Sequence, residues 1–192
     1  MPDKTNKAAT KSGGWSAARQ HLTTWEKPAL LALVKELYES AAGNRDFIQA
    51  RCNAEATSGE VLEKYRRKVV EPFFPARGEP KLKLGEARKA IRDYRKATGN
   101  IPGTAELLMT YVENGARFTR QYGDISEGFY SSVESALDEL AALLRGEAQE
   151  IYSQFSARLA EVDRMASGIG WGFGDYIGDI VAGLKGDLGE QS

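Results

Sequence analysis

The chain has 192 residues, of which 42% are hydrophobic and 28% are charged, and its formal net charge is -1. This composition is typical of a globular domain and excludes an intrinsically disordered chain, while the single cysteine excludes an intramolecular disulfide. Alanine and leucine together occur 42 times, whereas valine and isoleucine together occur 16 times. Because β-branched residues are so few, the composition predicts helices and no sheet.

The start of the chain, residues 1–14, carries three lysines among small and polar residues. It lacks the continuous apolar stretch of a secretory signal, and we expect a disordered leader here. A helical domain is expected over 15–167, followed by a glycine-rich helix docked on it over 168–192. No window is apolar enough to span a bilayer, which predicts a cytoplasmic protein that does not contact membranes.

Capping residues and apolar spacing predict the first helices. Thr23–Glu26 matches a capping box and opens a helix that is expected to run to about Ala42. A short helix is expected over 45–56, in which Cys52 is interpreted as a small buried hydrophobe. A second capping box, Thr57–Glu60, opens the next helix.

Prolines and glycines predict where the following helices end. Pro72 and Pro75 end the helix that begins near Thr57, and a loop is expected over 74–83. The later helices have apolar residues at helical spacing, with Tyr122 on the apolar face of one of them. They are expected from Leu84 to Gly99, from Thr104 to Gly123, from Ser126 to Gly146 and from about Ile151 to about Val162.

The last segment is unusually rich in glycine, with eight of the 22 residues from Gly168 to Gly189. Each interior glycine costs a helix about 1 kcal/mol relative to alanine, so a helix here needs a surface to pack on. We predict that its apolar stripe docks on the domain or on a partner. The stripe consists of Trp171, Phe173, Ile177, Ile180, Val181 and Leu184.

The small net charge hides two blocks of opposite sign. Residues 64–96 contain twelve Lys or Arg against four Asp or Glu, whereas residues 124–190 contain four against thirteen. The basic block predicts a positive surface, which either binds a nucleic-acid backbone or pairs with the acidic block within one chain or between chains. Its candidate members are Lys64, Arg67, Lys81, Lys83, Arg88, Arg92 and Lys96.

No motif in the sequence specifies a reaction. A helical diiron site needs Glu-x-x-His pairs, but the only histidine, His21, has no glutamate three residues before it. The acidic pairs Glu134 with Asp138 and Asp175 with Asp179 are interpreted as solvated helix faces, because lone pairs lack the further ligands that hard cations need. The sequence therefore predicts no catalytic residue, no cofactor and no metal site.

Three stretches carry a resemblance to a known family. They are KLKLGEARKAIRDYRKATG (81–99), ELLMTYVENGARFTRQYGDISEGFYSS (106–132) and GWGFGDYIGDI (170–180). From about Leu22 onward, the chain resembles an uncharacterised bacterial family of small all-helical proteins, a domain of unknown function. The resemblance implies a HEAT-like arrangement of helical hairpins that includes the glycine-rich end, and it implies no activity, cofactor or functional residue.

These observations predict an all-α single domain of about seven to eight helices, packed as antiparallel hairpins in a HEAT-like or irregular bundle. The expected function is non-catalytic: an intracellular helical interaction module that binds a protein partner or itself. The alternative is a nucleic-acid accessory protein that binds the phosphate backbone through the basic centre at 64–96. No sequence feature supports an enzyme.

Overall fold

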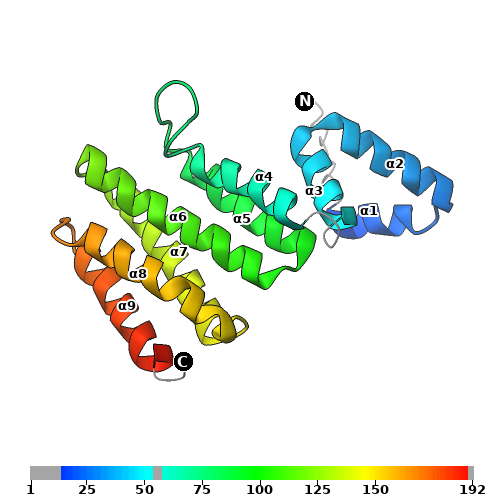
Figure 1. Cartoon of the computed structure of the whole chain (residues 1–192). Coiled ribbons are helices and arrows are strands. Elements are labelled where there is room, and N and C mark those ends of the chain that lie inside the picture. The colour runs from blue at the N-terminus through cyan, green and yellow to red at the C-terminus, as the bar shows by residue number, and fades with distance from the viewer. Residues whose placement is uncertain (1–13, 54–57, 190–192) are drawn as a thin grey trace, which may run out of the picture. The chain divides into compact units, whose positions relative to one another are not determined.

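The computed structural model describes residues 14–53 and 58–189, and it confirms the all-α class. Within these ranges there are nine α-helices, one short 3-10 helix and no strand (Figure 1). The helices are α1 (Trp15–Leu22), α2 (Lys27–Ser40), α3 (Ala42–Asn53), α4 (Ser58–Val70), α5 (Leu84–Thr98), α6 (Ile101–Tyr122), α7 (Glu127–Arg145), α8 (Tyr152–Ala166) and α9 (Phe173–Leu188), with the 3-10 helix at Gln149–Ile151.

The chain divides into two compact units, and the boundary lies inside α3, between Asp46 and Phe47. In the first unit, neither α1 nor α2 has a buried residue. The second unit holds the hydrophobic core, which begins at Ala50 and continues to Leu188. The second unit is therefore the part of the chain in which side chains are held in fixed positions by packing.

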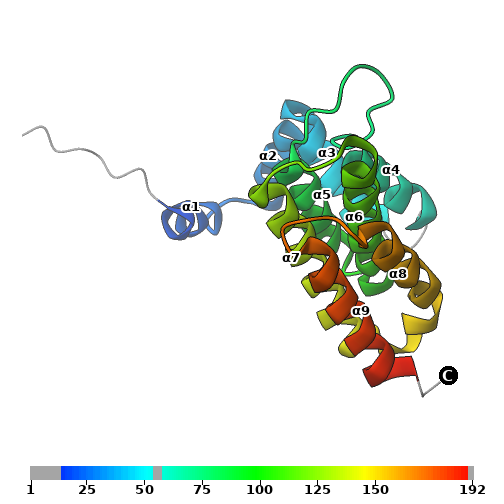
Figure 2. The same cartoon turned by 90° about the vertical axis from the view of Figure 1, so that its left-hand side faces the viewer.

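The second unit is built from three antiparallel hairpins, α4 with α5, α6 with α7, and α8 with α9 (Figures 1 and 2). Helices α4, α6 and α8 pack side by side in one layer, and α7 packs against α9 in the other. This arrangement confirms the predicted packing of antiparallel hairpins. The loops 71–83, 123–126 and 167–172, which join the two helices of each hairpin, lie at one end of the unit, here named the loop end (Figure 1).

The central helix is α6, in which 13 of 22 residues are buried. It approaches α7 closely at Gly115, where a Cβ atom would lie 2.5 Å from Cγ2 of Val133. The two helices can pack this closely only because Gly115 has no side chain. A single methyl group at Gly115 would therefore disturb the packing of α6 on α7.

The glycine-rich segment forms α9, which packs on α7 and α8. Phe173, Ile177 and Leu184 are buried, and two further apolar residues of α9 are half-buried against the core. The glycines permit a close approach here also, because a Cβ at Gly174 would lie 2.7 Å from the carbonyl oxygen of Ala166. Burial of this stripe offsets the low helix propensity of the segment.

Three predicted helix starts were wrong, and one of them, expected at Arg45, lies inside α3, which begins at Ala42. Thr23 does not cap α2; its Oγ1 donates to the carbonyl of Gln20 at the end of α1. Helix α2 begins later because Pro28, in its first turn, has the φ that a helix needs and no N–H to satisfy. Thr104 is also not a cap, because Asn100 accepts a hydrogen bond from the N–H of Gly103 at 2.8 Å and starts α6 earlier.

One helix was not predicted, one interpretation was wrong, and some predictions fall on residues that the structure does not describe. Helix α1 lies in the predicted domain but was not identified, since it is short and has no buried face. Cys52 is exposed on α3, so its interpretation as a buried hydrophobe was wrong. Residues 1–13 of the predicted leader, Thr57 of the second capping box and residues 190–192 lie outside the described residues.

The contact between α6 and α7 predicts the effect of one methyl group. We expect Gly115→Ala to lower the free energy of unfolding by about 1 to 3 kcal/mol, because the new Cβ overlaps Val133. Urea unfolding measures the change, and adding Val133→Ala should restore part of the loss. Gly128→Ala is the matched control in α7, where nothing lies within 4 Å of the new Cβ and stability should not fall. Equal midpoints for Gly115→Ala and the unchanged protein would contradict this packing.

Candidate functional site

Trp171 is the one residue of the predicted stripe that the structure leaves exposed. It lies in loop 167–172 with 71% of its surface accessible and a φ of 62°. This left-handed conformation is disfavoured for every residue with a Cβ and is normally occupied by glycine. Neither burial nor backbone geometry therefore accounts for a tryptophan at this position.

Loop 167–172 is held against the loop of the neighbouring hairpin. A Cβ at Gly170 would lie 3.9 Å from a carboxylate oxygen of Asp124. The hydroxyl of Tyr130 donates to Oδ1 of Asp124 at 3.1 Å, and the ring of Tyr130 packs on Phe173 with 4.9 Å between the centroids. The backbone around Trp171 is thus supported by buried groups, although the indole itself points away from the core.

A second exposed aromatic side chain lies at the same end of the unit. Tyr122, the last residue of α6, lies on the predicted apolar face against Phe118 but is 51% exposed. Its ring packs on Phe118, Phe118 packs on Phe74, and the guanidinium of Arg117 lies 4.8 Å from the Phe74 ring centroid. We name these exposed or half-buried groups at the loop end the loop-end surface: Phe74, Arg117, Arg120, Tyr122 and Trp171.

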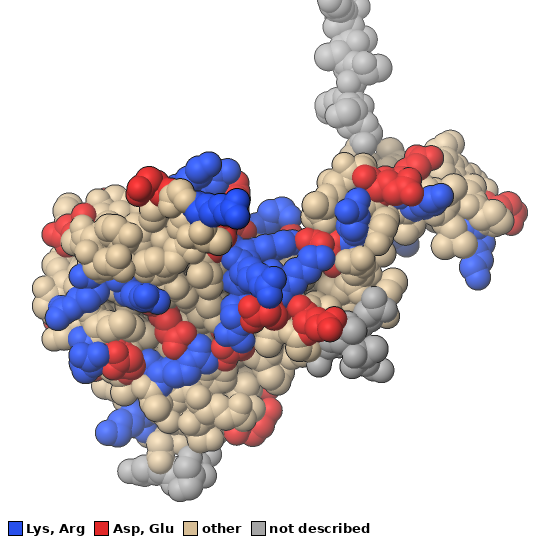
Figure 3. Space-filling model, turned by 45° about the horizontal axis from the view of Figure 1, so that its top comes forward, with Lys and Arg blue, Asp and Glu red and all other residues tan. Residues whose placement is uncertain are grey.

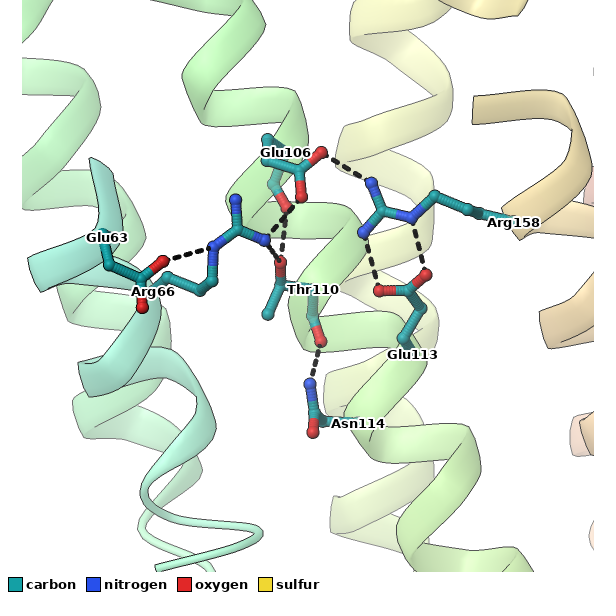
Figure 4. A network of polar contacts seen from close by, with 7 residues as sticks. All are labelled: Glu63, Arg66, Glu106, Thr110, Glu113, Asn114 and Arg158. Atoms are coloured by element: carbon teal, nitrogen blue, oxygen red, sulfur yellow. Dashed lines mark hydrogen bonds and ion pairs between the residues drawn. The ribbon is translucent and has the colours of Figure 1, made fainter. Parts of the chain in front are cut away.

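A polar network joins the three hairpins across α4, α6 and α8 (Figure 4). Glu106 accepts a hydrogen bond from Arg66 at 2.7 Å and one from Arg158 at 2.6 Å. Arg158 also binds both carboxylate oxygens of Glu113, each at 2.7 Å. Burial alone would raise the pKa of Glu106, but the hydrogen bonds from the two arginines outweigh it and lower that pKa.

Two arginines of the basic block pair with the acidic block inside this one chain. Arg88 of α5 binds Glu139 of α7 and lies over the ring of Tyr111. Arg95 of α5 binds Glu147 at 2.9 Å, beyond the end of α7. These two ion pairs use the positive charge of α5 to attach it to the central hairpin.

The other predicted basic residues are for the most part held by nearby groups. Arg67 lies 3.5 Å from Glu63, and Lys83 lies 2.8 Å from Glu86. On the face shown in Figure 3, the Lys and Arg side chains accordingly lie among Asp and Glu side chains. Of the rest, Lys64 donates to Gln49, Lys96 lies over the ring of Phe47, and Lys81 and Arg92 are exposed.

In one of the two acidic pairs, Asp138 is bound by another side chain. The hydroxyl of Tyr176 donates to Asp138, and this hydrogen bond raises the pKa of Tyr176 to about 12. Among the described residues, no group of three or more His, Cys, Asp and Glu side chains could hold a metal ion. Over the same residues, no helix combines the length and the apolar composition needed to cross a membrane.

Two cavities lie in the second unit. One, of about 310 Å³, lies among the N-terminal ends of α4, α6 and α8, and its only carboxylate, Glu106, is already bound by two arginines. The other, of about 250 Å³, lies in loop 71–83 and is lined by lysine, arginine and glutamate side chains with prolines. Neither lining contains a histidine, cysteine, serine or threonine.

Sequence reasoning missed the loop-end surface and the polar network for different reasons. Arg117 and Arg120 lie outside the basic block, so the count of charges along the chain did not select them. Glu106 and Arg158 are 52 residues apart, and nothing in either helix indicates that they meet. The spacing of Glu106, Thr110 and Glu113, which places three polar groups on one face of a mostly buried helix, was the available signal.

The network predicts a stability effect that depends on pH. We expect Glu106→Gln to lower the free energy of unfolding by about 1 to 2 kcal/mol at neutral pH, because two arginines lose their charged acceptor. The lowered pKa of Glu106 means that this stabilisation is present above the ordinary carboxyl pKa and is lost as the pH falls through the folded-state value.

Urea unfolding at neutral pH and at acidic pH measures both effects, and the variant should lose less stability on acidification than the unchanged protein. Glu161→Gln is the control, since its carboxylate is exposed and pairs only with Arg164 on the same helix. A Glu106→Gln protein as stable as this control at neutral pH would contradict the role given to the network.

No protein-family model, no curated protein and no solved structure matches this chain. The likeness to a bacterial helical family of unknown function therefore stays a hypothesis.

Proposed function

We propose that this chain is a non-catalytic helical interaction module that binds a protein partner through the loop-end surface. The observation that carries the proposal is Trp171, which is exposed and held in a left-handed conformation between two glycines. Non-glycine residues in such conformations cost about 1 to 3 kcal/mol and cluster at functional sites. A tryptophan that does not stabilise the fold is best explained by a contact outside it.

The composition of the loop-end surface supports a protein partner. Tryptophan, tyrosine and arginine are the residue types most enriched among the residues that dominate binding energy at protein interfaces. Trp171, Tyr122 and Arg117 bring these types to one end of the stacked hairpins. The underlying hairpins are packed on a common core, so we expect little further ordering when a partner binds.

Nucleic-acid binding through residues 64–96 is the weaker alternative. A phosphate backbone binds to cations that are free to replace its counterions. In this block, Arg88 and Arg67 are among the side chains that already have carboxylate partners in the same chain. At least six of the twelve Lys and Arg side chains of the block have such a partner among the described residues, which reduces the positive charge available to a phosphate backbone.

The proposal predicts that Trp171 affects binding and not stability. We expect Trp171→Gly to change the free energy of unfolding by no more than about 1 kcal/mol, because glycine removes the left-handed strain. The same variant should lose the partners that the unchanged chain captures from a cell lysate treated with nuclease.

Trp15→Gly is the matched control, since Trp15 is 72% exposed but lies on α1. Capture that survives Trp171→Gly but not Trp15→Gly would refute the proposed surface. Capture that disappears when nuclease is added would favour the nucleic-acid alternative. A captured second copy of this chain, lost with Trp171→Gly, would identify the partner as the protein itself.

A further inference from the structure

Arg117 and Arg120, on the last turns of α6, form no ion pair with any residue in 14–53 or 58–189. The carboxylate four residues before Arg117 is Glu113, but both of its oxygens are bound by Arg158. The carboxylate four residues after Arg120 is Asp124, which accepts a hydrogen bond from Tyr130. The acidic groups within helical reach of both arginines are therefore engaged by other side chains.

The exposed face of α6 thus differs between its two ends. Toward the start of the helix, Glu106 and Glu113 are met by Arg66 from α4 and Arg158 from α8. Toward the loop end, no carboxylate of a neighbouring described helix meets Arg117 or Arg120. In the C-terminal half of α6, the charges of Arg117 and Arg120 therefore have no ion-pair partner on a neighbouring described helix.

The helix dipole does not explain these arginines completely. Cations are favoured near the C-terminal end of a helix, by about 0.3 to 1 kcal/mol at exposed sites. That interaction leaves the donors of each guanidinium free for hydrogen bonds with an external group. Arg117 is also held in place by its stacking on Phe74, which orders the guanidinium before a ligand binds.

We propose that the partner of the loop-end surface presents an acidic segment, whose carboxylates bind Arg117 and Arg120 while an apolar side chain of the segment packs against the half-buried ring of Phe74. This inference rests on the proposed function and names the chemistry of the partner. Arginine binds carboxylates bidentately, as the pair of Arg158 with Glu113 does within this chain. The Phe74 ring beside the Arg117 guanidinium suits a segment that combines negative charge with an apolar anchor.

A peptide is favoured over nucleic acid by the small number of cations on α6. A phosphate backbone gains affinity from several cations in a row, whereas the basic residues of α6 are Arg117 and Arg120. A short acidic segment needs only two cations. The arrangement therefore fits a few separated carboxylates better than a regular row of phosphates.

The test uses the full chain and a fluorescein-labelled peptide in which glutamates surround one central leucine. Fluorescence anisotropy at low ionic strength measures binding of this peptide, of the same peptide with glutamine in place of glutamate, and of a short oligouridylate. We expect the glutamate peptide alone to bind, and the double variant Arg117→Glu/Arg120→Glu to weaken it by about tenfold or more. The control Arg19→Glu/Arg92→Glu changes the net charge equally at two exposed arginines elsewhere and should bind as the unchanged chain does.

Equal binding of the glutamate and glutamine peptides, or equal loss in both double variants, would overturn the inference. Tighter binding of the oligouridylate that depends on Arg117 and Arg120 would overturn it in favour of nucleic acid. The variant Arg117→Gln/Arg120→Gln, checked by urea unfolding, keeps the result interpretable if charge reversal disturbs folding. Capture of a lysate partner that requires Trp171 but neither arginine would leave the proposed function standing and remove this inference alone.

Discussion

The contact between α6 and α7 is the constraint on which the rest of the second unit depends. The contact is close because Gly115 leaves room for the side chain of Val133. In the resulting hairpin, α6 packs against α4 and α8, and α7 packs against α9. Each outer hairpin buries its apolar stripe on this centre. Even α9, whose glycines make it a poor helix in isolation, is ordered by the packing of Phe173, Ile177 and Leu184.

Ion pairs join the hairpins of this chain at several points. Glu106 lies between Arg66 and Arg158, so one carboxylate connects a helix from each of the three hairpins. On the other side, Arg88 connects α5 to Glu139 of α7. A sequence that looks like two opposed charge blocks becomes, once folded, a set of specific pairs.

At the loop end, some aromatic residues are exposed and some charges are unpaired among the described residues. Trp171 is exposed in a conformation that suits glycine, Tyr122 is exposed at the end of a helix that is otherwise mostly buried, and Arg117 lacks an acidic partner within the described chain. Each of these features costs the fold something or leaves a group unsatisfied. Their occurrence at one end of the hairpins is the physical reason to place the function there.

The sequence by itself determined the helical class, the hairpin arrangement and most helix ends, because apolar spacing and terminal glycines such as Gly99 act locally. It failed at starts set by Pro28 and Asn100, where several residues compete to cap one helix. Only the tertiary structure decided which charges are paired, since Glu106 and Arg158 meet through packing and not through spacing. Only the tertiary structure separated Trp171 from the buried residues of its own stripe, because the loop before α9 turns its side chain away from the core.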